Sequence, residues 1–126
     1  MDLIIGGAFQ GKSIYAKEQY PKKKWVLGGE VSEEELLSAQ GILEFQKYVR
    51  KELKQGHSVK DLAEKIAGEN PDAVIVCDEV GYGVVPTDVF ERQYREAVGR
   101  ICIELAKKSK RVVRVICGIG TVIKDA

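Results

Sequence analysis

The chain has 126 residues, of which 44% are hydrophobic and 31% are charged, a composition typical of one folded domain and not of a disordered or fibrous chain. Twenty basic and 19 acidic residues leave a formal net charge of +1, so no overall field attracts nucleic acid or an anionic membrane, and the longest apolar run is too short to span a bilayer. We therefore expect a single cytoplasmic domain over residues 1–126, with no nucleic-acid partner and no membrane partner.

The first elements along the chain are predicted to be a strand, a helix and a second strand. Residues 1–5 form a short apolar run that ends at two glycines, as expected of a buried strand that enters a tight loop. A helix is predicted to begin at Lys12 and to be stopped by Pro21. Residues 24–27, bounded by glycines, are predicted to form the second strand.

Three helices are predicted in the middle of the chain. Ser32 with Glu35 three residues later is a capping box, which starts the first of them. Apolar residues recur at three- and four-residue spacing between Ile42 and Leu53, which predicts an amphipathic helix over that range. Ser58 is predicted to cap another short helix that ends near Gly68.

The last third of the chain predicts two more strands around a long helix. Residues 73–77 are continuously apolar, as a strand buried on both faces requires. After a glycine-rich loop, Asp88 and Glu91 are predicted to open a helix that runs to about Lys107. Residues 111–117 form the last clear strand. This alternation predicts an α/β fold of the P-loop NTPase type, with a mostly parallel sheet and helices on both faces.

The segment between the first strand and the first helix matches the phosphate-loop pattern Gly-x-x-x-x-Gly-Lys-Ser in its expected context. Glycines allow several backbone N–H groups to converge on phosphate oxygens, and the helix N-terminus adds partial positive charge. We expect ATP or GTP to bind at this loop through Gly6, Gly7, Ala8, Phe9, Gln10, Gly11, Lys12 and Ser13.

Two residues of the loop have chemical roles that follow from their side chains. Lys12 is expected to reach the β- and γ-phosphates, and the Ser13 hydroxyl is placed to ligate Mg²⁺. An acidic residue at the end of a neighbouring strand usually completes such a metal site, directly or through water. The candidates are Glu79, which follows the strand over residues 73–77, and Glu30, which follows the strand over residues 24–27.

The three cysteines are Cys77, Cys102 and Cys117, and all stand in apolar contexts. No two of them have the short spacing of a zinc site or of a redox motif. We expect all three to be buried thiols in a reducing compartment. The N-terminal residues lack a charged segment followed by an apolar run, so no leader peptide is predicted.

Residues 78–86 resemble the Asn-Glu-Val-Gly-x-Gly-Ile-Val-Pro segment of the bifunctional adenosylcobinamide kinase and adenosylcobinamide-phosphate guanylyltransferase family of cobalamin biosynthesis. The phosphate loop of that family reads Gly-Gly-Ala-Arg-Ser-Gly-Lys-Ser, and this chain differs from it only at Phe9 and Gln10. Residues 92–100 are similar to its Arg-x-Phe-Arg-Asp-x-x-Gly-Arg segment, and residues 117–124 are similar to its C-terminus. The chain is thus identified as a shortened member.

The resemblance implies transfer of the γ-phosphoryl group of ATP or GTP to a hydroxyl, for which a corrinoid such as adenosylcobinamide is the candidate acceptor, with Glu79 orienting the acceptor or holding metal-bound water. It also implies a homo-oligomer. Arg92, Arg95 and Arg100 are candidates for contacts with phosphate or acceptor, or alternatively for solvent-facing charges on the long helix. A nucleotide-binding subunit or sensor without acceptor chemistry is the alternative function, and a loop that binds only structural phosphate is a third.

Three departures from the family pattern affect the predicted chemistry. Asp78 and Cys102 each stand where the family usually has Asn. The stretch that carries the family's guanylylated histidine is missing between the first helix and Ile42. His57 does not match that position, and we expect it to be an exposed turn residue. Guanylyl transfer through a histidine is therefore not expected.

Overall fold

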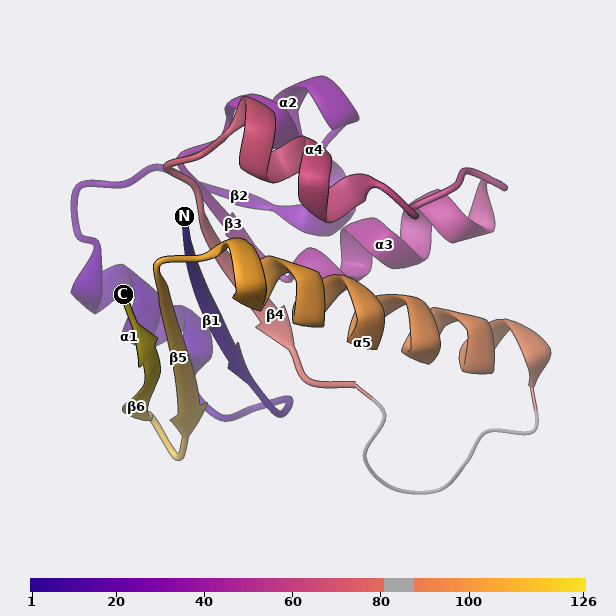
Figure 1. Ribbon diagram of the computed structural model, residues 1–126. Coiled ribbons are helices and arrows are strands. Elements are labelled where there is room, and N and C mark those ends of the chain that lie inside the picture. The colour runs from indigo at the N-terminus through magenta and orange to yellow at the C-terminus, as the bar shows by residue number, and fades with distance from the viewer. Residues whose placement is uncertain (81–87) are drawn as a thin grey trace.

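The computed structural model of the chain describes residues 1–80 and 88–126. In this part of the chain six strands form one sheet, in the order β2-β3-β4-β1-β5-β6 (Figure 1). The strands are β1 (Asp2–Gly6), β2 (Trp25–Leu27), β3 (Gly41–Leu43), β4 (Val74–Asp78), β5 (Arg111–Ile116) and β6 (Ile119–Asp125). The helices are α1 (Lys12–Gln19), α2 (Glu33–Ser38), α3 (Phe45–Lys54), α4 (Leu62–Glu69) and α5 (Val89–Lys108), and a 3-10 turn, Gly28–Glu30, follows β2.

Strand β1 lies inside the sheet, parallel to β4 on one side and to β5 on the other. Ile4 is in register with Val76 of β4 and with Val113 of β5. Strands β2, β3 and β4 are also parallel neighbours, and only β6 runs antiparallel. The predicted, mostly parallel α/β sheet is therefore confirmed. Its register pairs Gly6 with Asp78, so the glycine-rich loop and the end of β4 leave the same edge of the sheet.

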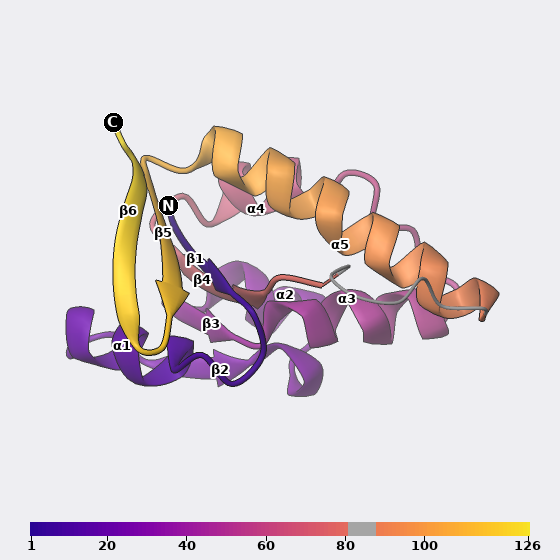
Figure 2. The ribbon, with the colours of Figure 1, turned by 90° about the horizontal axis from the view of Figure 1, so that it is seen from below.

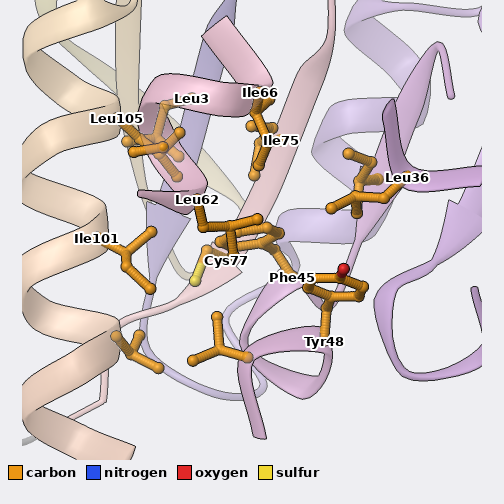
Figure 3. Close-up of a cluster of buried hydrophobic side chains, with 14 of the residues drawn as sticks. Leu3, Leu36, Phe45, Tyr48, Leu62, Ile66, Ile75, Cys77, Ile101 and Leu105 are labelled. Atoms are coloured by element: carbon orange, nitrogen blue, oxygen red, sulfur yellow. The ribbon is translucent and has the colours of Figure 1, made fainter. Parts of the chain in front are cut away.

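The two faces of the sheet are covered unequally. On one face, strand residues such as Leu3 and Ile75 pack against side chains of α2, α3, α4 and α5 (Figure 3). On the other face, Ile4 and Val76 form a smaller cluster with Ala16 of α1. Figure 2 shows α1 and α5 on opposite sides of the sheet. The prediction of helices on both faces is confirmed, because successive residues of a strand point to opposite faces and both sets are apolar.

Two helix starts follow the predicted capping pattern. The Ser32 hydroxyl accepts a hydrogen bond from the Glu35 backbone N–H at 3.2 Å, and the Glu35 carboxylate accepts one from the Ser32 backbone N–H at 3.2 Å. At the start of α5, the Asp88 carboxylate accepts a hydrogen bond from the Glu91 backbone N–H at 3.0 Å. Both caps satisfy donors that a helix N-terminus otherwise leaves unpaired.

The helix predicted from Ile42 to Leu53 is wrong at its beginning. Residues 41–43 form the buried strand β3, which pairs with β2 and β4. Glu44 then takes a left-handed conformation, with a φ of 54°, and α3 begins at Phe45. The spacing of Ile42 and Phe45 fits a helix as well as it fits two separate elements, and pairing within the sheet overrides the local pattern.

The predicted cap of α4 is also wrong. Ser58 accepts a hydrogen bond from the Lys60 backbone N–H at 3.3 Å, four residues before the helix begins at Leu62. Asp61 occupies the cap position without a side-chain hydrogen bond to the helix. A polar cap residue in sequence therefore predicted the helix but not the residue at which it begins.

Strand β6, which the sequence pattern does not predict, pairs with β5 through a two-residue turn at Cys117 and Gly118. Both turn residues have a positive φ, 52° and 75°, which is the geometry of the tight hairpin turn that suits twisted strands. Gly118 adopts it without strain. The turn exposes Cys117, so the prediction that all three cysteines are buried is wrong for Cys117, whereas Cys77 is buried and Cys102 is half-buried.

Residues 81–87, which carry the predicted glycine-rich loop and part of the segment that resembles the family, lie outside the described residues. Of the helices in residues 1–80 and 88–126, none has the length and apolar character that a membrane span requires.

Candidate nucleotide site

The glycine-rich loop joins the end of β1 to the N-terminus of α1, as the sequence predicts. Gly11 has a φ of 83° and precedes the first residue of the helix, Lys12. Phe9 also has a positive φ, 61°, a conformation that costs a residue with a Cβ about 1–2 kcal/mol. Its ring is fully exposed. The loop thus curls over the helix N-terminus, where backbone N–H groups and the helix dipole favour an anion.

Gly6 is required at the base of the loop because its neighbours leave no space for a side chain. A Cβ added to Gly6 would lie 2.5 Å from the backbone oxygen of Val115 on β5 and 3.2 Å from Cδ of Lys12. The backbone oxygen belongs to the adjacent strand and has little room to move. The loop therefore begins in direct contact with β5.

Lys12 points back into the loop and is only 6% exposed. Its Nζ donates a hydrogen bond to the Gly7 backbone oxygen at 2.7 Å and lies 2.7 Å from the Asp78 Oδ1. A buried ammonium needs such partners, because desolvating an unpaired charge is costly. The result is a fixed positive charge between the loop and the carboxyl end of β4.

A second set of contacts fixes the loop from the opposite side, through the β5–β6 turn. The Gln10 side-chain oxygen accepts a hydrogen bond from the Cys117 backbone N–H at 2.7 Å. The Gln10 backbone oxygen accepts another from the Gly118 N–H, also at 2.7 Å. Gln10 is one of the two loop residues that differ from the family pattern, and here it connects the loop to the β5–β6 hairpin.

A pocket of about 400 Å³ opens at the loop, within the range of small-molecule sites. Its walls come from the loop, the start of α1, the beginning of α3 and the end of β4. Gln46 connects two of these walls, because its side-chain oxygen accepts a hydrogen bond from the Asp78 backbone N–H at 3.0 Å. The lining residues are Ala8, Phe9, Gln10, Gly11, Lys12, Ser13, Ile14, Glu44, Gln46, Lys47, Val76 and Asp78.

The sheet order separates the two candidate carboxylates. Strand β4, which Glu79 follows, is next to β1, whereas β2 is separated from β1 by β3 and β4. Glu30 is exposed at the end of the turn after β2. The Glu79 carboxylate is held by Arg114 of β5, with Nη2 to Oε2 at 3.1 Å and Nε to Oε1 at 3.0 Å. The carboxylate beside Lys12 is that of Asp78.

Sequence reasoning had no signal for several pocket residues. Glu44, Gln46 and Lys47 come from the β3–α3 junction, which the sequence predicts to be continuous helix. In the sequence, Asp78 is apparent only as a departure from the family's Asn. Its position one residue before Glu79 on β4 could have suggested it, since alternate residues of a strand point to opposite faces.

The candidate arginines and the histidine lie elsewhere. Arg92, Arg95 and Arg100 are on α5. None of them is among the described residues that line the loop pocket. Arg92 and Arg100 are exposed and Arg95 is half-buried. His57 is exposed in the turn after α3, with Nδ1 2.6 Å from Glu52 Oε2. Its expected exposure is confirmed.

A smaller pocket of about 360 Å³ adjoins the first one and shares Asp78 with it. Glu79 and the half-buried Cys102 also line this second pocket, together with Ile5, Val80, Val98, Gly99 and Ile103. Polar groups are therefore confined to the side near β4, and α5 supplies an apolar wall. Asp78 is the residue common to both pockets.

The oxygen groups around the loop fit a magnesium ion that is bound together with a nucleotide. Ser13, at the start of α1, and Asp78, at the end of β4, supply a hydroxyl and a carboxylate to the pocket lining, and Glu44 supplies a further carboxylate. In the described part of the chain no three His, Cys, Asp or Glu side chains cluster as a metal cage. Magnesium suits such a sparse set, because it usually keeps several waters and is held by one or two protein oxygens and by phosphates.

An open, mostly parallel sheet whose first strand leads through a glycine-rich loop to a helix, with a buried lysine at its start, defines an α/β protein of the P-loop class. Residues 31–123 match the family described as cobinamide kinase / cobinamide phosphate guanyltransferase, and the chain belongs to this family. The matched range begins after the loop. The assignment of residues 6–13 therefore depends on their own pattern and geometry.

Two curated proteins show similarity over a shorter stretch. They are the bifunctional adenosylcobalamin biosynthesis proteins CobU of Escherichia coli (strain K12) and of Salmonella typhimurium (strain LT2). Each is 41% identical to this chain over 51 residues, which is 40% of this chain and 28% of the relative. The matched stretch thus covers little more than a quarter of each relative.

Proposed function

We propose that the domain binds the phosphates of ATP or GTP, with Mg²⁺, at residues 6–13 and transfers the γ-phosphoryl group to a hydroxyl acceptor. The observation that carries this proposal is the buried Lys12 ammonium, held between the Gly7 oxygen and the Asp78 carboxylate at the start of α1. The family to which the chain belongs supports a corrinoid, such as adenosylcobinamide, as the acceptor.

Phosphate binding exchanges partners around Lys12. The ammonium leaves the Gly7 oxygen and donates to phosphate oxygens instead, which are stronger acceptors because they are charged. Since the site already orders the lysine, little side-chain entropy is lost when the ligand binds. Asp78, one hydrogen-bond length from Lys12 in the free protein, is then available to a second cation.

Ser13 and Asp78 would hold Mg²⁺, whose charge neutralises the phosphate oxygens during transfer. The protein contributes position and charge. Lys12 and the loop N–H groups fix the γ-phosphoryl group, and Glu44 and Lys47 form the opposite wall of the pocket. Such positioning accounts for most of the catalysis of phosphoryl transfer.

We assign Asp78 to the nucleotide side of the reaction and Glu79 to the acceptor side. Glu79 lines the second pocket and is fixed there by Arg114. An acceptor hydroxyl in that pocket would approach Asp78 from the side opposite the phosphate loop. Glu79 would orient the hydroxyl by accepting its hydrogen bond. Glu30 has no part in this arrangement, because β2 is two strands away from β4.

Turnover with a hydroxyl acceptor tests this proposal. Asp78→Ala, which removes the side-chain oxygens altogether, should lower turnover by roughly 100-fold or more and weaken the magnesium dependence of nucleotide binding. Glu79→Gln should lower turnover while nucleotide affinity stays within a few-fold of wild type. Glu30→Gln, exposed and remote, is the matched control and should leave both unchanged. Equal turnover by Glu79→Gln and wild type would remove Glu79 from the acceptor side.

A nucleotide-binding subunit or sensor is the second candidate function. The short match to the curated relatives, 28% of their length, favours it because most of each relative has no counterpart in the matched stretch. A protein of this kind would bind Mg-nucleotide but consume none with any corrinoid or other hydroxyl acceptor. Measuring nucleotide binding and acceptor-dependent consumption on one preparation separates the two functions.

The homo-oligomer implied by the resemblance stays a prediction. Strand β6 is at the edge of the sheet, and Ile119, Val122 and Ile123 on it are exposed. Sedimentation of the purified chain across a range of concentrations would measure its assembly directly, and Ile123→Lys would show whether this edge takes part.

A further inference from the structure

Two cysteines that the proposed reaction does not use face each other across the core. Cys77 is at the end of β4 and Cys102 is in the middle of α5, and their sulfur atoms lie 3.6 Å apart. Figure 3 shows Cys77 among the core side chains between the sheet and α5. A disulfide has an S–S length of about 2.05 Å, so the two sulfur atoms must approach each other by only about 1.5 Å to form one.

The two thiols differ in access. Cys77 is fully buried, whereas Cys102 is half-buried and lines the pocket of about 360 Å³ beside β4. A small oxidant can therefore reach Cys102 but not Cys77. The close pairing with the Cys77 thiol also lowers the pKa of Cys102, which favours its thiolate, the form that reacts.

We infer that Cys77 and Cys102 form a site of reversible thiol oxidation, at which a hydroperoxide converts the pair into an intramolecular disulfide. In the first step the Cys102 thiolate attacks the peroxide, the O–O bond breaks, and Cys102 becomes a sulfenic acid with release of hydroxide or alkoxide. In the second step the Cys77 sulfur attacks the Cys102 sulfur, and the departing hydroxide takes the Cys77 proton and leaves as water. The two sulfurs lose two electrons, which reduce the peroxide.

The position of the bond gives it a structural consequence. Cys77 directly precedes Asp78, whose carboxylate pairs with Lys12. A disulfide would tie α5 to the strand end that carries Asp78. It would also close a loop between residues 25 positions apart in sequence. Such a cross-link is expected to raise the melting temperature by roughly 5–15 °C.

The test uses the full chain with Cys117→Ser, which removes the exposed third thiol at the hairpin turn. The protein is treated with hydrogen peroxide, quenched, denatured and alkylated, and its intact mass and peptide map are measured. We expect both thiols to resist alkylation together, a mass two hydrogens lower than the reduced chain, a peptide linking Cys77 to Cys102, and full reversal by dithiothreitol. The melting temperature should rise on oxidation and fall again on reduction.

The matched variant is Cys102→Ser in the same background. It should leave Cys77 fully alkylatable after peroxide treatment, and its melting temperature should not rise. Three results would overturn the inference: two alkylatable thiols after peroxide treatment of the Cys117→Ser chain, sulfinic acid on Cys102 with Cys77 still free, or disulfides found only between chains. None of these readouts depends on nucleotide binding, so they stand apart from the proposed function.

Discussion

Adding one methyl group to Gly6 tests whether the phosphate loop is seated against β5 as the structure shows. In Gly6→Ala the new Cβ would lie 2.5 Å from the Val115 backbone oxygen, about 1 Å inside the usual contact distance. Overpacking of this kind costs about 1–3 kcal/mol. Scaling the unfolding entropy to 126 residues, each kcal/mol lowers the melting temperature by roughly 4 °C, so the expected fall is roughly 4–12 °C.

The matched control is Gly99→Ala in the middle of α5, where an added Cβ meets nothing within 4 Å. There the substitution should stabilise the protein by about 0.5–1 kcal/mol, because alanine loses less backbone entropy in a helix. Thermal unfolding followed by circular dichroism measures both variants. A Gly6→Ala protein at least as stable as wild type would refute the packing described for the base of the loop.

Three further predictions concern single residues. Gln10→Ala removes the hydrogen bond from the Cys117 N–H and should cost about 1 kcal/mol of stability in denaturant unfolding. An unchanged denaturant midpoint would show that this hydrogen bond between the turn and the loop does not stabilise the protein. Ser32→Ala removes the cap that accepts from the Glu35 N–H and should also cost about 1 kcal/mol, with no change in nucleotide affinity. Incubation with GTP and Mg²⁺ should give no acid-labile adduct by intact mass, whereas an adduct lost in His57→Ala would show that His57 carries nucleotide.

Much of the fold could be predicted because local pattern and tertiary contacts agree. The apolar residues of β4 predict a buried strand and the glycines after β1 predict a tight loop, and few other structures fit these two patterns. A strand buried on both faces must be continuously apolar, and the loop must be free of side chains at Gly6. The long helix α5 likewise begins with a capping Asp88 and keeps one apolar face.

The errors occur where contacts distant in sequence decide the local structure. Ile42 belongs to a strand of three residues, and a strand so short has no periodicity of its own. The turn before β6 consists of Cys117 and Gly118, and the cysteine gives none of the signal that Asn-Gly or Asp-Gly gives. Strand order has no local signal in the sequence either, and it is the position of β4 beside β1 that favours Glu79 over Glu30.

The assignment of roles to Asp78 and Glu79 needed side-chain geometry. Both residues follow the apolar run over residues 73–77, and the pattern of an acidic residue after a strand predicts Glu79 as the carboxylate of the site. The structure pairs Asp78 with Lys12 and Glu79 with Arg114, which comes from β5 and is 35 residues away from Glu79. The spacing of residues within one strand or helix cannot predict a contact between residues so far apart in sequence.

The most direct test of the central claim is calorimetric titration of the wild-type chain with Mg-ATP and Mg-GTP, repeated with Lys12→Ala and with Lys17→Ala. Lys17 is exposed in the last turn of the same helix and controls for loss of one positive charge. We expect at least one nucleotide to bind wild type and Lys17→Ala alike, and Lys12→Ala to bind it roughly 10- to 100-fold more weakly, as the loss of charge-assisted hydrogen bonds requires. Equal affinity of Lys12→Ala and wild type, or no binding of either nucleotide by the folded wild-type chain, would contradict the assignment of residues 6–13 as a nucleotide site.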